Sequence, residues 1–237
     1  MAIWNRTKPD SVIQPGKFIV IEGTDGTGKT TQVKLLAETL SNYNYDGVIF
    51  DFPQYTNVSS ALLDNYLKGA YGQLNPEAAS ILYAVDRFDA SFSVREHLSE
   101  GRVVLANRYV SSNAGHQGAK IMDAQERIKF FKWLDNLEYT TFNIPRPDLT
   151  IILHLPVEMS LELIRKGHEA KGTRPDLHDQ DLEHLERAEQ VYLEIAELFP
   201  NTKLIECSED GRLLTPQEIH AKVWELVRRI VLKNNTF

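Results

Sequence analysis

The sequence predicts an α/β fold, a five-stranded parallel sheet with helices on both faces. Short apolar runs alternate with segments of helical periodicity from about residue 17 to the end. The most apolar run, residues 149–155, is typical of a strand that is covered on both faces. A glycine-rich loop joins the first apolar run to the first helical segment. Right-handed crossovers between such strands give a parallel sheet, which binds ligands at the carboxyl ends of its strands.

The chain is expected to form one domain over residues 17–237, because no linker or internal repeat interrupts the alternation. Residues 1–16 are interpreted as a polar N-terminal arm that lacks the apolar core of a signal peptide. Short runs rich in β-branched and apolar residues predict the strands. They are residues 17–22, 47–51, 102–106, 149–155 and 202–206.

Capping signals predict where several helices begin. Asn75 precedes a proline at the first helical position, Asp123 is followed by Glu126, and Thr215 opens a Thr-Pro-Gln-Glu segment. The predicted helices are residues 30–40, residues 76 to about 97, 125–138, 157–166, 181–199 and a last helix after residue 215.

The composition of the chain excludes several classes of protein. A formal net charge of −7 argues against a protein that coats nucleic acid polymers or an anionic membrane, since both need a broad basic surface. Cys207 is the single cysteine, so an intramolecular disulfide is excluded and a reducing, cytoplasmic location is expected. No apolar run is long enough to cross a bilayer.

The glycine-rich loop matches the phosphate-binding pattern GxxxxGK[ST] at every fixed position and lies between a predicted strand and a predicted helix. Its backbone N–H groups and the helix N-terminus are expected to bind phosphates, Lys29 to reach the β- and γ-oxygens, and Thr30 to ligate Mg²⁺. A plain tight turn would need neither the lysine nor the threonine. The expected ATP-binding residues are Gly23, Thr24, Asp25, Gly26, Thr27, Gly28, Lys29, Thr30 and Thr31.

Four segments in order, EGTDGTGKTTQ, DFPQY, LYAVDR and NRYVSSNAGHQGAK, resemble the thymidylate kinase family. The resemblance extends from about Lys17 to the last helix. It implies transfer of the γ-phosphoryl group of ATP to dTMP with Mg²⁺, a homodimer, and a mobile LID that closes over ATP. The LID is expected at about residues 167–179.

The resemblance implies an acceptor pocket after the second strand. Phe52 would shape it and Tyr55 would bond the acceptor phosphate; alternatively both residues roof the core. Tyr83 and Arg87 lie four residues apart on one helix face, where Tyr83 would stack on thymine and Arg87 would donate to a base carbonyl. Without the family pattern, Tyr83 would be a core residue and Arg87 the partner of Asp86 or a surface carboxylate.

Three further residues would complete the pocket. Arg108 would clamp the acceptor phosphate, Asn113 would read the edge of the thymine ring, and His116 stands where relatives usually have a tyrosine beneath the deoxyribose. The alternatives are that the loop around Asn113 is capped by its own polar residues and that His116 packs elsewhere.

The catalytic set implied by the resemblance is Lys29, Arg108, Arg174 and Asp25. One family type carries an arginine where this chain has Gly26, so the LID is expected to supply the catalytic arginine. Arg174 is the candidate, with Arg165, Lys166 and Lys171 as helpers; the alternative is a solvated basic loop balanced by nearby aspartates.

Asn107 replaces the family's aspartate at the end of a strand, where a carboxylate usually helps to hold Mg²⁺ through water. Asp25 is the residue expected to compensate, so Thr30 and Asp25 are the expected metal ligands. Two rival functions remain open at this point. One is a deoxynucleoside kinase with Asp51 as its base, and the other is a nucleotide-binding regulator that transfers no phosphate.

Overall fold

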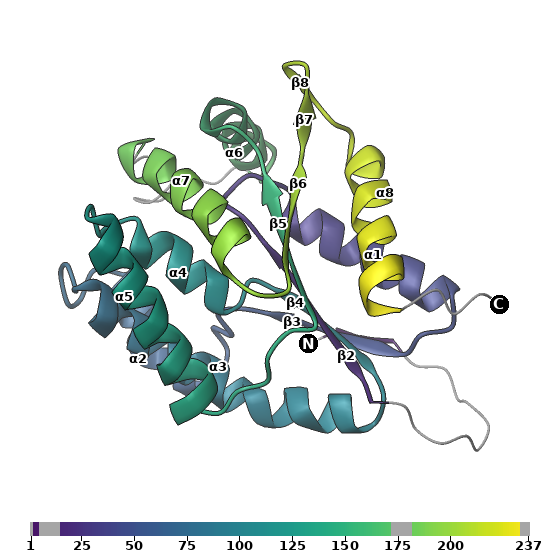
Figure 1. Ribbon diagram of the computed structural model, residues 1–237, viewed down its shortest axis with the longest axis horizontal. Helices are drawn as coiled ribbons and strands as arrows, with labels where there is room; N and C mark the ends of the chain where they lie inside the picture. The colour runs from purple at the N-terminus through teal and green to yellow at the C-terminus, as the bar shows by residue number, and fades with distance from the viewer. Residues whose placement is uncertain (1, 5–14, 172–181, 233–237) are drawn as a thin grey trace.

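The computed structural model describes residues 2–4, 15–171 and 182–232. Its centre is a six-stranded sheet in the order β1-β3-β4-β2-β5-β6 (Figure 1). The five predicted strands are present and parallel to one another, which confirms the predicted fold class. They are β2 (Lys17–Glu22), β3 (Gly47–Asp51), β4 (Val103–Asn107), β5 (Leu149–His154) and β6 (Thr202–Glu206).

A sixth strand, β1 (Ala2–Trp4), was not predicted, because residues 2–4 were assigned to the polar arm. It runs antiparallel to β3, with Ala2 opposite Ile49. Three residues are too few to reveal a two-residue period, and the pairing partner lies far along the chain. A short edge strand of this kind leaves no signal of its own in the sequence.

Eight α-helices occur in the described residues. The predicted caps are formed: Asn75 and Asp123 accept hydrogen bonds from Ala78 N and Glu126 N, and Thr215 forms a reciprocal capping box with Glu218. The short helices α2 and α4 were not predicted. The helices are α1 (Lys29–Asn42), α2 (Ala61–Leu67), α3 (Pro76–Ser99), α4 (Val110–Gly118), α5 (Ala124–Asp135), α6 (Val157–Lys171), α7 (Leu182–Leu198) and α8 (Pro216–Leu226).

The remaining elements are short. A two-stranded hairpin follows β6, and single turns of other helix types flank α2, α5 and α8. None of the described helices has the length and apolar content needed to span a membrane. These elements are β7 (Ser208–Glu209), β8 (Arg212–Leu213), a 3-10 turn (Val58–Ser60) and two π-helical turns (Asn136–Thr141 and Val227–Val231).

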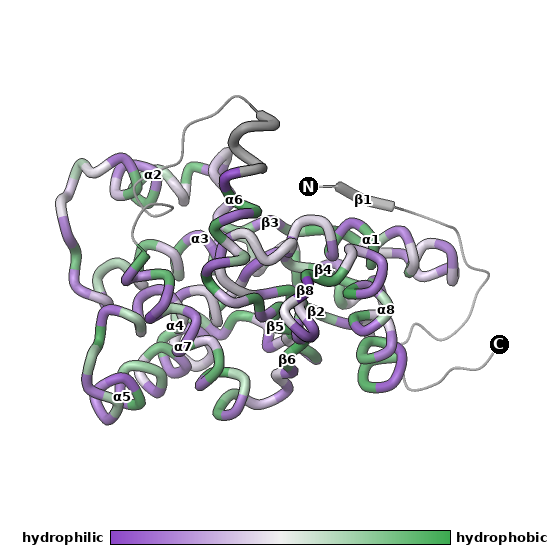
Figure 2. The backbone as a smooth tube through the Cα atoms, turned by 90° about the horizontal axis from the view of Figure 1, so that it is seen from above, coloured by the Kyte–Doolittle hydropathy of each residue, from purple (hydrophilic) through white to green (hydrophobic). Residues whose placement is uncertain are grey.

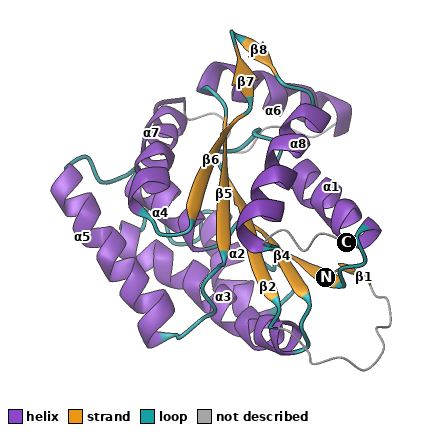
Figure 3. Ribbon diagram, turned by 45° about the vertical axis from the view of Figure 1, so that its right-hand side comes forward, coloured by secondary structure: helices purple, strands orange, loops and turns teal. Residues whose placement is uncertain are grey.

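Two hydrophobic layers hold the sheet between its helices. Alternate residues of β2 point to opposite faces, so Phe18 and Val20 join one layer while Ile19 and Ile21 join the other. Helices α3, α4, α5 and α7 cover the first face, and α1 and α8 cover the second (Figure 3). Along α5 and α8 the backbone alternates between hydrophobic and hydrophilic residues, as expected for helices with one buried side (Figure 2).

The strand register brings the predicted motifs to one edge of the sheet. Asp51 at the end of β3 lies opposite Asn107 at the end of β4, and Asn107 in turn lies opposite Ile21 of β2. The glycine-rich loop starts directly after β2. The carboxyl ends of these three strands therefore place the loop and the residues after β3 and β4 side by side.

Candidate functional site

Two side chains at the end of the glycine-rich loop donate hydrogen bonds to the loop's own backbone at Thr24. Lys29 Nζ donates a hydrogen bond to Thr24 O at 2.6 Å, and Thr27 Oγ1 donates to the same carbonyl at 2.9 Å. Lys29 is buried, and burial together with the nearby Arg108 cation lowers the pKa of Lys29 to about 7. An anionic phosphate beside this amine would favour its charged form. The loop thus has the geometry of a phosphate-binding site.

Two of the loop glycines are required by close contacts as well as by backbone conformation. Gly23 has φ +136°, and a Cβ there would lie 2.4 Å from Leu153 O. Gly26 has φ +81°, and a Cβ there would lie 2.6 Å from Ser160 O on α6. A side chain at either position would clash with backbone atoms. Helix α6 therefore packs directly against the phosphate loop.

Glu22, the last residue of β2, organises the acceptor side. Its carboxylate is fully buried and accepts hydrogen bonds from Tyr109 N at 2.6 Å, Ser112 N at 3.1 Å and Ser112 Oγ at 2.7 Å. The carboxylate thereby satisfies N–H groups at the start of α4. Sequence analysis missed this role. The one available signal was a carboxylate at the end of an otherwise apolar strand.

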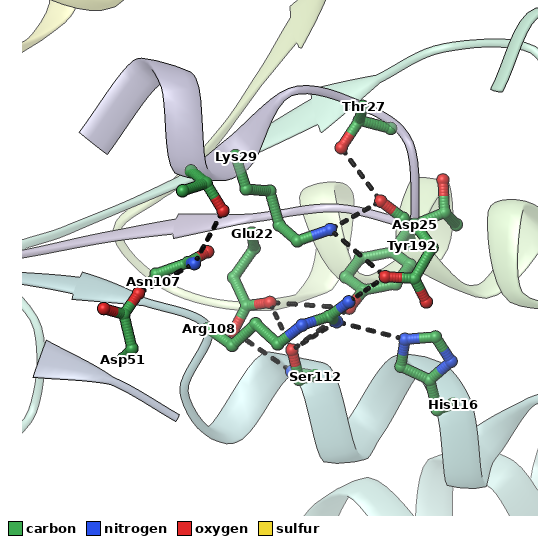
Figure 4. A network of polar contacts seen from close by, with 12 residues as sticks. Glu22, Asp25, Thr27, Lys29, Asp51, Asn107, Arg108, Ser112, His116 and Tyr192 are labelled. Atoms are coloured by element: carbon green, nitrogen blue, oxygen red, sulfur yellow. Dashed lines mark hydrogen bonds and ion pairs between the residues drawn. The ribbon is translucent and has the colours of Figure 1, made fainter. Parts of the chain in front are cut away.

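Arg108 connects the acceptor side to the phosphate loop. It has φ +68°, and its guanidinium forms an ion pair with Asp25 while donating to Ser112 Oγ and His116 Nε2, both at 3.3 Å (Figure 4). Burial alone would raise the pKa of Asp25, but the Arg108 and Lys29 cations outweigh it and hold that pKa well below its usual value. Asp25 is therefore a carboxylate facing two cations.

One cavity of about 1040 Å³, its solvent-open mouth included, lies beside this ion pair. The phosphate loop, the segment after β3, α3 and α4 all contribute to its wall. It brings together residues that are up to 159 positions apart in the sequence. The predicted site residues that line it are Asp25, Phe52, Tyr55, Tyr83, Arg87, Arg108, Asn113 and His116.

The segment after β3 is fixed by Asp86, which the sequence suggested only as an alternative partner of Arg87. Both oxygens of Asp86, on α3, accept a hydrogen bond from Gln54 N at 3.1 Å, and Ser60 Oγ donates to Asp86 at 2.6 Å. Phe52 is buried and its ring lies 5.5 Å from that of Tyr109, whereas Tyr55 is 59% exposed at the cavity. Phe52 is thus both a core residue and a cavity wall, and Tyr55 does not roof the core.

Arg87 is buried against Glu138, a residue 51 positions later. Arg87 Nε donates to Glu138 Oε1 at 3.0 Å, and the same carboxylate forms an ion pair with Arg87 Nη2. Arg87 still lines the cavity, as does Asn113, whose Nδ2 donates to Ser80 O at 3.1 Å. Burial raises the pKa of the Tyr83 phenol, which keeps it neutral. Glu138 is a second residue that sequence analysis missed.

His116 lies on α4 in a layer of rings. Its ring lies 5.8 Å from that of His184 and 6.0 Å from that of Tyr192, both on α7. Burial and the Arg108 cation lower the pKa of His116 to about 3, so the ring is neutral near pH 7 and accepts the hydrogen bond from Arg108. His184, which also lines the cavity, was not predicted.

A second group of polar side chains lies at the start of α1. Asn107 Nδ2 donates to Thr30 Oγ1 at 3.2 Å and to Asp51 Oδ1 at 2.9 Å. Asn107 Oδ1 is buried and has no hydrogen-bond partner among the described residues. Hydroxyl, carboxylate and amide oxygens are ligands suited to Mg²⁺, so this group fits the ion that a phosphate loop binds. Thr31 follows on the exposed side of α1.

The predicted LID lies mostly outside the described residues. Helix α6 continues to Lys171, so residues 167–171 are helical rather than loop. The side chains of Lys166 and Lys171 and the whole of Arg174 fall outside the described part of the chain. Arg165 is exposed on α6.

Comparisons with known proteins agree with this architecture. The family model described as thymidylate kinase matches residues 21–219. The chain is 32% identical to the probable thymidylate kinase of Pyrococcus horikoshii, with 92% of this chain and 98% of that protein covered. It is 30% identical to the thymidylate kinase of Bradyrhizobium diazoefficiens, with 92% and 93% covered.

A solved structure of thymidylate kinase from Candida albicans has the same fold. The two superpose with a TM-score of 0.71 at 23% identity, covering 91% of this chain and 92% of that one.

Proposed function

The chain belongs to the thymidylate kinase family, and from this premise we propose that it transfers the γ-phosphoryl group of ATP to dTMP, giving dTDP and ADP. The observation that carries the proposal is the ion pair between Arg108 and Asp25. It joins a phosphate-binding loop to a cavity that seven predicted acceptor-side residues line. A phosphoryl donor and a phosphorylated acceptor bound at these two places would meet at Arg108.

On the donor side, the N–H groups of residues 23–31 and Lys29 would bind the ATP phosphates. Thr30 would ligate Mg²⁺, and Asp25, the other expected ligand, is paired with Arg108 and Lys29. The ion supplies positive charge that offsets the negative charge developing on the transferred group. Phosphoryl transfer depends mainly on positioning and on such charge stabilisation, so the fixed contacts of Lys29 and Arg108 matter more than a covalent role for any side chain.

On the acceptor side, Arg108 would bind the dTMP phosphate and Tyr55 would donate a neutral hydrogen bond to it. Tyr83 would stack on the thymine ring, and Asn113 and Arg87 would contact its polar edge. The Arg87 guanidinium is already paired with Glu138. That pairing supports a role in which the arginine is rigidly aimed at a carbonyl rather than at a phosphate.

His116 would lie beneath the sugar, and Phe52 would shape the pocket beside it. Arg174, from the segment 167–179, would bring the last positive charge when both nucleotides are bound. Such an arginine typically increases the rate by a factor of about 10³ to 10⁵. Gly26 supports a catalytic arginine that comes from outside the phosphate loop, because the loop has no room for a side chain at this position.

A direct assay separates the proposal from its nearest rival. If the chain were a deoxynucleoside kinase, it would phosphorylate thymidine and use a carboxylate near the 5′-hydroxyl. Asp51 is bonded to Asn107 and is absent from the described residues that line the cavity. The experiment measures ADP release with dTMP and with thymidine under identical conditions. Turnover with thymidine alone would overturn the proposal, and binding without turnover would favour a regulator.

We also propose that the protein works as a homodimer. Helix α3 exposes Ile81, Val85, Phe88 and Phe92, spaced so that all four lie along one face of the helix. Exposed apolar stripes of this kind mark interaction sites. A second copy of the chain would cover this stripe, and size-exclusion chromatography with light scattering tests this assembly. Cytoplasmic location is part of the same proposal, since ATP and dTMP would be its substrates.

A further inference from the structure

The edge where β3 and β4 end carries polar groups that the cavity does not use. Asn107 holds Thr30 and Asp51 together through one nitrogen, within 3.2 Å of Thr30 Oγ1 and 2.9 Å of Asp51 Oδ1. Figure 4 shows Asp51 and Asn107 on the opposite side of Lys29 from Asp25 and His116. The site therefore has two sides, separated by Lys29. Asp51 lies on the side where α1 begins, together with Thr30.

Charge balance distinguishes Asp51 from Asp25. Asp25 Oδ1 is paired with Arg108 and lies 3.8 Å from Lys29 Nζ, so two cations already offset its charge. Asp51 has a different environment, because its hydrogen-bond partner within the described part of the chain is the neutral amide of Asn107. An amide orients a carboxylate without neutralising it. Asp51 thus has no cationic partner among the described residues, and the Asn107 amide links it to the Thr30 hydroxyl.

We propose that Asp51 is the positioning carboxylate for the Mg²⁺ ion that Thr30 binds, and that Asn107 orients it. The inference rests on the proposed function, since it assumes a nucleotide in the phosphate loop. Mg²⁺ in such sites is held by one or two carboxylates and substrate phosphates and keeps several waters. Asp51 accepts hydrogen bonds from those waters. Asn107 Oδ1, buried without a partner in the described residues, is a second oxygen available to them.

The test uses Mn²⁺ as a spectroscopic substitute for Mg²⁺. Free Mn²⁺ is measured by electron paramagnetic resonance during titration of the protein–ADP complex, for wild type and Asp51→Asn. Groups that orient a metal site from outside its direct ligands are typically worth 10- to 100-fold in metal affinity. We expect Asp51→Asn to weaken Mn²⁺ binding about tenfold. Unchanged affinity would overturn the assignment.

The matched control is Asp46→Asn, which removes the same charge just before the other end of β3. Asp46→Asn should leave Mn²⁺ affinity unchanged. If it weakened Mn²⁺ binding as much as Asp51→Asn does, the effect would come from the net charge of the protein rather than from the position of Asp51, and the proposal would be overturned. A rescue variant, Asp51→Asn with Asn107→Asp, moves the carboxylate one strand closer to Thr30. We expect it to recover most of the Mn²⁺ affinity. Failure to recover would show that Asp51 acts structurally.

Failure of the proposed function remains distinguishable from failure of this assignment. ADP binding is measured separately without metal, by calorimetry. Absence of ADP binding in wild type would contradict a nucleotide-binding phosphate loop, and with it the role of Asp51. Normal ADP binding with unchanged Mn²⁺ affinity in Asp51→Asn would contradict the assignment of Asp51 alone.

Discussion

Arg108 Nη2 and Asp25 Oδ1 form an ion pair between the start of α4 and the phosphate loop. The contact joins residues 83 positions apart, one from each half of the site. Arg108 can bind an acceptor phosphate only by sharing its guanidinium with Asp25 or by leaving that carboxylate. The affinities for donor and acceptor are therefore expected to be linked through this pair.

Lys29→Met should reduce turnover to less than a hundredth of wild type while leaving the fold intact. Methionine keeps most of the buried stem but removes the charge that would reach the phosphate oxygens. Steady-state kcat and the melting temperature are the measurements. Lys34→Met, at an exposed position of the same helix, is the control and should change neither. Retained turnover would contradict the phosphate-loop assignment.

Arg174→Ala should lower kcat at least tenfold and change the KM for dTMP little. The reason is that a charge delivered on closure stabilises the transition state more than the ground state. Initial rates over a range of dTMP concentrations separate the two constants. Arg229→Ala, an exposed arginine at the far end of the chain, is the control. Small and equal changes in kcat and KM would make Arg174 a surface residue.

Glu22→Gln should lower the free energy of unfolding by about 2 kcal/mol, because hydrogen bonds to a buried carboxylate are each worth about 1.5–3 kcal/mol. It should also raise the KM for dTMP, since Tyr109 N, which Glu22 binds, follows Arg108 directly. Urea denaturation and kinetics measure the two effects. Glu197→Gln, an exposed substitution on α7, should do neither. Stability equal to wild type would contradict the organising role of Glu22.

The neutral state of His116 should make the protein less stable in mild acid. Its folded pKa of about 3 lies below the unfolded value of about 6.5, so between these values the unfolded chain binds the extra proton. The free energy of unfolding then falls as pH decreases, by up to about 1.4 kcal/mol per pH unit. His116→Gln removes this dependence, so its stability curve between pH 6.5 and 4.5 should be flatter. Urea denaturation at several pH values measures it.

His154 provides a control of opposite sign for that measurement. Burial alone would lower its pKa, but hydrogen bonds to Glu206 and Glu189 raise it above the usual value. Its contribution to stability is present below pH 6.5 and is lost as pH rises through the folded pKa. His154→Gln should therefore destabilise the protein most in mild acid. Parallel curves for wild type and His116→Gln would contradict a buried neutral His116.

His116→Tyr should sharpen the preference for dTMP over 5-methyluridine monophosphate about tenfold, equivalent to about 1.4 kcal/mol. A tyrosine ring leaves less room for a 2′-hydroxyl, whereas imidazole is smaller and can bond to one. The ratio of kcat/KM for the two nucleotides is the measurement. His116→Phe separates ring size from the phenol hydroxyl. An unchanged ratio in both variants would exclude His116 from the sugar pocket.

The strands were predictable because each is a short apolar run, and their bounds differ from prediction by at most one residue at either end. Helix α4 was missed because its sequence, VSSNAGHQG, contains two glycines and little periodicity. It forms because Glu22 binds its N-terminus and because Tyr192 fits against Gly115, where a Cβ would lie 2.6 Å from the ring. Contacts between residues this distant leave no trace in local periodicity.

The candidate site was likewise predictable where local sequence motifs encode it and not where it depends on distant contacts. Sequence motifs selected eight residues that share one cavity, since motif residues follow the strands whose ends meet there. The partners that hold them, Glu22, Asp86 and Glu138, belong to other elements and were not selected. A buried carboxylate looks like any other acidic residue in the sequence until the fold shows what surrounds it.

The contact between Gly26 and Ser160 O also constrains how this chain can evolve. An arginine in the phosphate loop, as in the other family type, would require α6 to move away first, because its Cβ would overlap a backbone oxygen. A single mutation at position 26 is thus expected to damage the protein before it can help catalysis. Under the proposed role of Arg174, position 26 and the LID are therefore not interchangeable sources of the catalytic cation by a single substitution.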